Sequence, residues 1–308
     1  MIALKVDRSV RYFFLASLAR VLWMLARIVP RPVGLSCFGM LGYLVFRLSR
    51  RERKRTLDHL QLIYGDAWDR KKIHTVARDV FIGLGKNLFD AFFLWGLSGQ
   101  RFFELVKSDR LEEFKNAAAK NRGVIIITAH VGCFEMLLHF FARCGFPIIA
   151  IGKKAKDTRI DNLLRKMRSG PNIQYMDRSE NSRKILRSLR EGKLCGVLVD
   201  QDTDVEGVFA RFMGKPAFTP SGPVRIAMKN EIPVFVVTTI RLQDNTHRVF
   251  LSRQVDLANT GNFHNDLVTN VQKINDLLCK TIEQYPSQWV WMHRRWKKQQ
   301  PLQEHINR

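Results

Sequence analysis

The sequence is short of acidic side chains relative to basic ones. Its 308 residues include 28 aspartates and glutamates against 51 lysines and arginines, which gives a formal net charge of +23 at pH 7. So large an excess implies an anionic partner, which can be nucleic acid, a negatively charged membrane surface or an acidic substrate. Composition alone does not choose among these three.

Cysteine is also sparse, with five residues scattered along the chain and no C-x-x-C pair. The pattern predicts neither a disulfide framework nor a zinc site, and it is typical of a reducing compartment. Cys133 lies inside the central motif described below, yet no partner base stands at a recognisable spacing. We therefore interpret Cys133 as a packed side chain. The sequence indicates no metal site and no cofactor.

Motifs of several other protein classes are missing. The chain has no helix-turn-helix, zinc-finger or RNP motif, which argues against a nucleic-acid partner despite the positive charge. It also has no G-x-S-x-G nucleophile elbow, so no serine nucleophile is predicted. A hydrophobic content of 46% with 26% charged residues is typical of a folded protein that can bury a sizeable core.

A long uninterrupted hydrophobic run is absent as well. Val10 to Ile28 is apolar but contains three arginines, and Val33 to Phe46 spans only about 14 residues, fewer than the roughly 20 needed to cross a bilayer. No small-residue cleavage site follows, so a signal peptide is not indicated. We predict that residues 1–48 form a membrane-associated helical hairpin or one tilted span, ahead of a main domain over residues 49–308. The alternative is a core helix of a soluble protein.

A basic cluster follows the apolar segment directly. Arg47 to Arg55 reads R-L-S-R-R-E-R-K-R, with six basic residues and one acidic residue. Such a cluster next to an apolar stretch is typical of a segment that binds anionic lipid, and the positive-inside rule places the following domain in the cytoplasm. The sequence thus predicts an anionic membrane surface as one partner.

Beyond residue 120, predicted strands alternate with predicted helices. Val124 to Thr128 is rich in β-branched residues and apolar on both faces, as expected of a strand buried in a parallel sheet. The pattern predicts further strands at 148–151, 173–176, 196–200 and 234–240, helices at 135–143, 159–168, 182–191, 223–229 and 262–284, and two or three helices between 56 and 120. The fold class is therefore α/β, with a mostly parallel central sheet flanked by helices and a membrane-associated helical segment at the N-terminus.

The central stretch, Gly123 to Glu135, reads G-V-I-I-I-T-A-H-V-G-C-F-E. It places His130 on a strand-to-helix turn at the carboxyl end of a strand, the edge where open α/β sheets bind ligands. With Glu135 in the first helical turn, we predict that its carboxylate folds back onto the imidazole and makes His130 a general base. The alternative is a structural histidine beside a glutamate that complements the helix dipole.

Other polar residues follow predicted strands or precede helices. Asp200 ends a strand, so it should lie at the same edge as His130 or, alternatively, cap the next loop. Thr219 and Ser221 lead into a helix whose first backbone N–H groups suit an anion. Arg294 and Arg295 stand among three tryptophans, a composition typical of membrane interfaces and of phosphate binding.

The motif from His130 to Glu135 resembles the H-x-x-x-x-E signature of the late acyltransferases of lipid A biosynthesis, which are relatives of glycerolipid acyltransferases with an H-x-x-x-x-D motif. Three further stretches resemble the same family in the same order. They are Asp200-Gln201-Asp202, the segment from Gly207 to Pro223, and the closing segment from Tyr285 to Lys297 with its P-x-x-W-x-W-x-H-x-R pattern. Together the matches cover roughly residues 9 to 298.

The resemblance implies an enzyme at the cytoplasmic face of the bacterial inner membrane. It would transfer a fatty acyl chain from acyl carrier protein to a hydroxyl of a lipid A precursor, a phosphorylated glycolipid, with His130 as base, Glu135 as its orienting group and no covalent acyl-enzyme. Arg168 would hold a phosphate or the oxyanion, although Arg159 or Arg165 could be the equivalent residue. The alternatives are another phospholipid or glycolipid acceptor, and a non-catalytic membrane-binding or nucleic-acid-binding protein.

Overall fold

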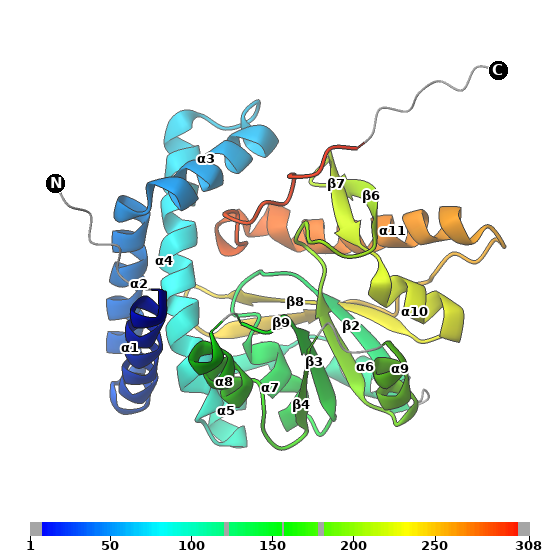
Figure 1. The fold of residues 1–308 in the computed structure, drawn as a ribbon, viewed down its shortest axis with the longest axis horizontal. Coiled ribbons are helices and arrows are strands. Elements are labelled where there is room, and N and C mark those ends of the chain that lie inside the picture. The colour runs from blue at the N-terminus through cyan, green and yellow to red at the C-terminus, as the bar shows by residue number, and fades with distance from the viewer. Residues whose placement is uncertain (1–7, 120–122, 156, 178–181, 301–308) are drawn as a thin grey trace.

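The computed structural model describes residues 8–119, 123–155, 157–177 and 182–300. Within these residues, seven strands form one sheet in the order β1-β9-β8-β2-β5-β3-β4 (Figure 1). All neighbouring strands are parallel except β8 and β9, so the predicted α/β fold with a mostly parallel sheet is confirmed. The strands are β1 Val106–Ser108, β2 Val124–Thr128, β3 Ile148–Gly152, β4 Ile173–Asp177, β5 Leu194–Leu198, β8 Val234–Arg241 and β9 His247–Leu251.

Strand β2 lies between β8 and β5, and all five of its side chains are buried. Alternate side chains of a strand point to opposite faces of the sheet. Ile125 and Ile127 accordingly pack into one hydrophobic cluster, and Val124 and Ile126 pack into another. The two-sided apolar pattern of this stretch therefore reflects burial on both faces.

Helices cover both faces of the sheet (Figure 1). The cluster around Ile125 and Ile127 is completed by α4, α9, α10 and α11, and the cluster around Val124 and Ile126 by α5, α6 and α7. The bounds of these helices and of α8 are α4 Arg70–Trp95, α5 Gly99–Leu105, α6 Leu111–Ala119, α7 Met136–Arg143, α8 Thr158–Met167, α9 Ser182–Arg190, α10 Gly222–Asn230 and α11 Phe263–Gln284. Most predicted helix boundaries are correct to within two residues.

Sequence patterns missed several short strands. Strands β1 and β9 at one edge of the sheet were not predicted, and neither was the separate hairpin of β6 Gly207–Phe212 and β7 Lys215–Pro220. The hairpin turns at Met213 and Gly214, which both have positive φ, as two-residue hairpin turns require. The strand predicted at 196–200 spans 194–198 instead, because Asp200 already lies in the loop that forms the site.

The N-terminal region consists of α1 Arg8–Ile28 and α2 Arg31–Leu48, both packed on α4, and of α3 Arg50–Tyr64. Helices α2 and α4 approach each other very closely: a Cβ on Gly42 would lie 2.1 Å from the Phe81 carbonyl oxygen, and one on Gly85 would lie 2.0 Å from that of Phe38. Glycine at these positions is therefore required for the contact. The pairing fixes α2 against the rest of the protein.

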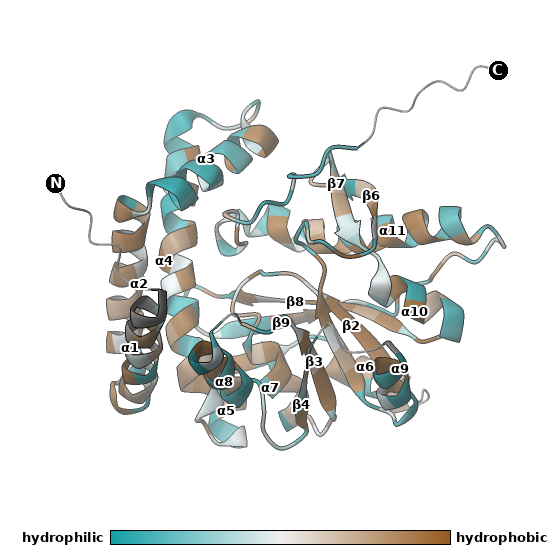
Figure 2. Cartoon of the chain, viewed as in Figure 1, coloured by the Kyte–Doolittle hydropathy of each residue, from teal (hydrophilic) through white to brown (hydrophobic). Residues whose placement is uncertain are grey.

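Helices α1 and α2 expose a broad apolar surface, which is brown in Figure 2. Exposed apolar side chains that gather on two consecutive helices, rather than lying singly over the surface, mark an interaction face. Among the described residues no single helix is long and apolar enough to cross a membrane, and α2 and α3 meet that requirement only as a pair bent by 89°. The exposed large side chains are Phe13, Leu15, Leu18, Val21, Met24, Leu25 and Ile28 in α1, and Val33, Met40, Leu41, Leu44, Val45 and Leu48 in α2.

Candidate active site

His130 lies on the turn that follows β2. Gly132 in the same turn has φ +57°, and a Cβ there would lie 2.1 Å from the Thr239 carbonyl oxygen, so only glycine fits. The turn is fixed to the closing segment by two backbone hydrogen bonds: Gly132 N–H donates to the Gln288 carbonyl at 2.9 Å, and Val290 N–H donates to the His130 carbonyl at 3.1 Å. His130 is therefore held rigidly at the carboxyl edge of the sheet.

Asp200 orients His130. The imidazole Nδ1 lies 2.8 Å from Asp200 Oδ1, and the His130 backbone N–H donates to Oδ2, also at 2.8 Å. Trp289 Nε1 donates to the same Oδ2 at 2.7 Å, and the carboxylate is fully buried. Burial opposes ionisation of Asp200, but the adjacent His130 and the hydrogen bonds from His130 and Trp289 hold the pKa of this carboxyl well below its usual range.

An ionised Asp200 fixes the tautomer of His130. The carboxylate accepts a hydrogen bond from Nδ1–H, which leaves the lone pair on Nε2 available to accept a proton. The same carboxylate stabilises the imidazolium that forms once a proton has been taken up. The pair thus has the geometry of a general base, and Asp200 does not serve as the loop cap considered as its alternative role.

The predicted contact between Glu135 and His130 is wrong. Glu135 stands at the start of α7 and its carboxylate binds Arg168 through both oxygens: Nε donates to Oε2 at 3.0 Å, and a terminal guanidinium nitrogen donates to Oε1. The reason is the register of the sheet, because Thr128 of β2 pairs with Leu198 of β5. Two residues beyond each of these positions, His130 and Asp200 meet side by side.

Arg168 is the arginine that reaches the site. Arg165 binds Asp161 at 2.7 Å and Arg159 binds Asp157 at 2.8 Å, both within or next to α8. Burial opposes the charge of Arg168, but its hydrogen bonds to Glu135 raise its pKa above the ordinary value. The Glu135–Arg168 ion pair thus stands as a second charged pair beside the His130–Asp200 pair.

A cavity of about 530 Å³ opens beside these two pairs. His130, Glu135, Arg168 and Gln201 supply polar groups to its lining, and the side chain of His130 is 18% exposed there. Most of the remaining lining is apolar, which is typical of a pocket for a ligand with a long apolar part. The apolar lining includes Ile126, Leu137, Leu138, Phe141, Ile148, Ile151, Val197, Leu198 and Ile226.

Arg295 and Thr219 do not have the predicted positions for binding an anion. Arg295 is fully buried and donates to Thr219 Oγ1 at 2.7 Å and to the Phe218 carbonyl, and its guanidinium lies 4.3 Å from the centre of the Phe212 ring. Burial lowers the pKa of Arg295 to about 10. These two residues join strand β7 to the closing segment, so a phosphate cannot reach either of them.

The other two residues predicted to bind an anion, Ser221 and Arg294, differ in their exposure to solvent. Ser221 is buried at the start of α10, and its hydroxyl has no hydrogen-bond partner in the described part of the chain. It is not among the residues that line the cavity, although its neighbours Pro220 and Gly222 are. Arg294 is exposed on the surface.

Sequence reasoning assigned no role to Gln201 or His293, although both fall within stretches it singled out. Gln201 Nε2 lies 3.1 Å from His130 Nε2 and 2.8 Å from His293 Nε2, and the two imidazole rings are 4.7 Å apart. Burial, together with the nearby charge of His130, lowers the pKa of His293 to about 4. The residue spacing in the sequence gave no sign that these side chains meet.

Cys133 is a packed side chain, as predicted. Its thiol donates to the Asn87 carbonyl at 3.6 Å, and burial raises its pKa to about 12. A thiol with so high a pKa is not a nucleophile at neutral pH.

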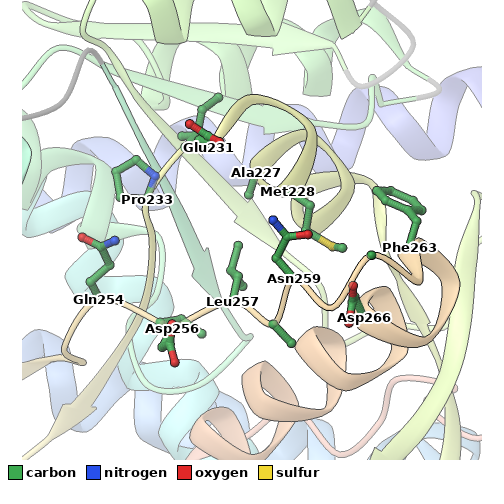
Figure 3. A pocket seen from close by; sticks show the side chains of 14 residues that line it. Ala227, Met228, Glu231, Pro233, Gln254, Asp256, Leu257, Asn259, Phe263 and Asp266 are labelled. Carbon is green, nitrogen blue, oxygen red and sulfur yellow. The ribbon is translucent and has the colours of Figure 1, made fainter.

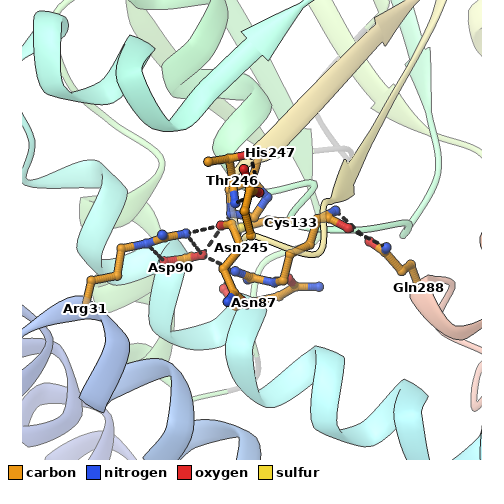
Figure 4. Close-up of polar contacts among 10 residues, drawn as sticks. Arg31, Asn87, Asp90, Cys133, Asn245, Thr246, His247 and Gln288 are labelled. Atoms are coloured by element: carbon orange, nitrogen blue, oxygen red, sulfur yellow. Dashed lines mark hydrogen bonds and ion pairs between the residues drawn. The ribbon is translucent and has the colours of Figure 1, made fainter.

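Two other features lie apart from this site. Asp90 of α4 is fully buried and binds Arg31, Arg241 and His247 (Figure 4). A second cavity, of about 380 Å³, lies between the end of α10, the loop 254–261 and the start of α11 (Figure 3). Its lining residue Asp266 is already bound to Thr260, through both the backbone N–H and the hydroxyl.

Comparison with known proteins shows the family of this chain. The sequence profile of the family described as "Bacterial lipid A biosynthesis acyltransferase" matches residues 4–298. The lipid A biosynthesis palmitoleoyltransferase of Escherichia coli K12 is 22% identical over 280 residues, which are 90% of this chain and 89% of that protein. The lipid A biosynthesis lauroyltransferase of the same organism is 22% identical over 279 residues, with the same coverage. The chain therefore belongs to the family of bacterial lipid A biosynthesis acyltransferases.

Proposed function

We propose that this protein transfers a fatty acyl chain from acyl carrier protein to a hydroxyl group of a lipid A precursor, a Kdo-bearing tetraacyl disaccharide bisphosphate. The observation that carries the proposal is the His130–Asp200 pair at the polar end of a cavity with an apolar lining. A general base must remove the proton of the acceptor hydroxyl, and the cavity offers space for an acyl chain beside that base.

The reaction needs one proton carrier. His130 Nε2 takes the proton of the acceptor hydroxyl while the hydroxyl oxygen attacks the thioester carbonyl carbon. The carbon–sulfur bond then breaks, and the proton on Nε2 passes to the leaving thiolate of the carrier protein. Asp200 stays ionised throughout and stabilises the imidazolium. No acyl-enzyme forms, in keeping with the high pKa of the Cys133 thiol.

The apolar lining supports binding of the acyl chain. Each methylene group that leaves water for such an environment contributes about 0.8 kcal/mol. A chain of a dozen carbons can thus supply several kcal/mol for binding, and the reacting carbonyl would then lie near His130. The Glu135–Arg168 pair at the same cavity would hold a phosphate of the acceptor through the guanidinium.

The surface charge and the exposed apolar helices support a location at the cytoplasmic face of the bacterial inner membrane. Helices α1 and α2 would lie with their apolar face in the membrane interface, and the basic cluster from Arg47 to Arg55 would contact anionic lipid. Each basic residue near such a surface contributes about 1 kcal/mol, an amount that decreases as the salt concentration rises. The net charge of +23 also suits the acidic carrier protein and the phosphorylated glycolipid.

The test is a reaction of the purified protein with an acyl-loaded carrier protein and the Kdo-bearing precursor, followed by mass spectrometry of the lipid. We expect a product with one additional acyl chain and no product with the His130→Ala variant. Phospholipid acceptors in parallel reactions serve as the comparison. Faster acylation of a phospholipid than of the precursor would overturn the proposed acceptor.

A further inference from the structure

Strands β3 and β5 are neighbours in the sheet but pair over only part of their length. Their pairing ends at Ala150 of β3 and Gly196 of β5. Beyond this last pair, β3 continues to pair with β4 on its other side, and β5 continues to pair with β2. A gap therefore opens between β3 and β5, and it faces the carboxyl edge of the sheet where His130 lies.

The cavity beside His130 extends into this gap. The residues that follow the last pair line the cavity and are partly exposed, although both strands lie inside the sheet; they are Ile151 and Gly152 of β3 and Val197 and Leu198 of β5. Further lining residues come from α7 on one face of the sheet and from α9 and α10 on the other. The cavity therefore passes through the plane of the sheet between β3 and β5.

The two parts of the cavity differ in character. The part on the α7 face is apolar and lies inside the protein, since the side chains that line it are buried; they include Ile126, Leu137, Phe141 and Ile148. The part toward α10 is lined by Glu206 and by Val205, which is 40% exposed, so it reaches the surface. An alkyl chain gains most by leaving water completely, which only the part on the α7 face allows.

Gly196 lies at the closed end of the gap. In the sheet it is flanked by Ile126 of β2 and Ala150 of β3, so a side chain at this position would point to the α7 face. A Cβ on Gly196 would lie 3.7 Å from Ile148 Cδ1, an ordinary contact distance. The position thus accepts a side chain without a clash, and a longer side chain would extend into the cavity that Gly196 lines.

We propose that Gly196 determines the length of the acyl chain that this protein transfers, and that the terminal methyl group of the chain lies over Gly196 on the α7 face. The inference rests on the proposed acyl transfer. Gly196 precedes Asp200 by four residues, which is about 13 Å at the rise of a strand, so the chain spans that distance from the base to the closed end. Gly152, the other glycine at the gap, does not offer the same space, because a Cβ there would lie 2.9 Å from the Tyr175 side chain.

The first test measures kcat/KM with carrier proteins whose acyl chains differ in length by single carbons. Gly196→Val should lower kcat/KM for the longest chain that the wild type uses by about 10 to 60-fold, because two or three methylene groups lose their place at about fourfold each. Chains about four carbons shorter should be transferred as by the wild type. The control is Gly99→Val, since Gly99 is exposed at the start of α5 and a Cβ there would lie in open space. An equal loss for chains of every length would overturn the proposal.

The second test exchanges space between two neighbouring positions. Ile148→Val removes the Cδ1 atom nearest to Gly196, so the preferred chain should become about one carbon longer, and Gly196→Ala should make it about one carbon shorter. The double variant should prefer the same length as the wild type, because the methyl group added at one position replaces the one removed at the other. These two small changes also decide the matter if Gly196→Val does not fold. An unchanged length preference in both single variants would refute the role of Gly196.

A third measurement needs no acceptor. The probe is a carrier protein loaded with the preferred acyl chain, which bears a photoreactive diazirine next to its terminal methyl group. Irradiation of its complex with the wild type, followed by mass spectrometry of the peptides, should place the label on Phe141 or Ile148. A label on Val205 or Ile226 instead would overturn the position of the chain, even if the protein acylates the lipid A precursor. Conversely, the expected label without acylation of the precursor would count against the proposed acceptor alone.

Discussion

In the part of the chain that the structure describes, two histidines each contact a buried aspartate, and only one of these pairs has the access that proton transfer to a substrate requires. His130 and Asp200 lie 2.8 Å apart at the edge of a cavity, and His247 and Asp90 lie 2.8 Å apart in the interior. The carboxylate is fully buried in both pairs. The side chain of His130 is 18% exposed, whereas that of His247 is fully buried.

The two carboxylates lie at the same distance from their histidines, but the charges around them differ. Asp200 accepts hydrogen bonds from uncharged donors of Trp289 and the backbone, so its negative charge remains available to stabilise a protonated His130. Asp90 is paired with two arginines, Arg31 and Arg241, which already neutralise it. Burial lowers the pKa of His247 and outweighs its hydrogen bond to Asp90.

The comparison shows that access and the surrounding charge decide whether this pair of residue types suits proton transfer or only joins parts of the fold. The Asp90 cluster joins four elements: Arg31 lies at the start of α2, Asp90 in α4, Arg241 in β8 and His247 in β9. It therefore ties the N-terminal helices to the sheet (Figure 4). The contacts of the cluster thus hold the N-terminal helices against the sheet.

The sharpest test makes the same substitution in both pairs. Asp200→Asn should lower kcat about 10³ to 10⁴-fold, because the amide favours the wrong tautomer of His130. Asp90→Asn should change kcat per folded molecule less than about threefold, because no reacting group contacts Asp90. The measurements are kcat and the folded fraction by circular dichroism. Equal losses of kcat in the two variants would remove the distinction between the pairs.

The Asp90 cluster should contribute more to stability than an exposed ion pair does. Asp90→Ala leaves two largely buried arginines without their carboxylate, which should lower the free energy of unfolding by about 3 to 5 kcal/mol. Chemical denaturation in detergent measures this, with Asp58→Ala as the control, since Asp58 pairs with Lys54 on the exposed surface of α3. An exposed pair contributes at most about 1 kcal/mol. Equal destabilisation by both substitutions would show that the Asp90 cluster has no structural role.

The Asp90 cluster should also affect stability in acid. Burial opposes the charge of Asp90, but hydrogen bonds from His247 and Arg31 and the charge of Arg241 lower its pKa. Since the folded-state pKa lies below the unfolded value of about 3.9, the stabilisation is present above about pH 4 and is lost as the pH falls below it. The free energy of unfolding should thus fall less steeply with decreasing pH below 4 in Asp90→Ala than in the wild type. Parallel slopes would contradict the depressed pKa.

The Glu135–Arg168 pair should show a smaller effect on activity than the His130–Asp200 pair. Glu135→Gln and Arg168→Lys each weaken a charge-assisted pair, so we expect a loss of about 10 to 100-fold in kcat/KM. If Arg168 holds a phosphate, its substitution should raise KM for a phosphorylated acceptor far more than for a dephosphorylated one. Glu135→Asp should retain part of the activity, as the H-x-x-x-x-D motif of the glycerolipid relatives suggests. Equal losses of kcat on the two acceptors, at unchanged KM, would exclude the phosphate role.

The smallest effect is expected at Cys133. Cys133→Ser keeps a donor for the Asn87 carbonyl and should change kcat less than about threefold, because the thiol is not the nucleophile. Cys133 should likewise resist thiol-alkylating reagents under native conditions, because it is buried. An acyl group trapped on Cys133 during turnover would disprove the direct-transfer mechanism.

Local sequence patterns predicted much of the fold and the position of His130, but they chose the wrong partner for this histidine. The apolar run from Val124 to Thr128 correctly predicted β2, and the turn expected after it predicted the position of His130. Glu135 was chosen as the partner because it stands five residues away, whereas Asp200 stands 70 residues away. Reading along the chain favours near neighbours, and only strand pairing brings distant residues together.

The sequence by itself thus determined the elements, the positive charge, the apolar N-terminus and the presence of His130 at a strand end, because these depend on residue type and local periodicity. The tertiary structure decided which groups meet. The register of β2 on β5 placed Asp200 against His130, and the closing segment brought His293 to Gln201. Arg295 stands among basic residues in the sequence, which predicted an exposed side chain, yet it is buried against β7. Side-chain exposure depends on packing between elements, which composition does not determine.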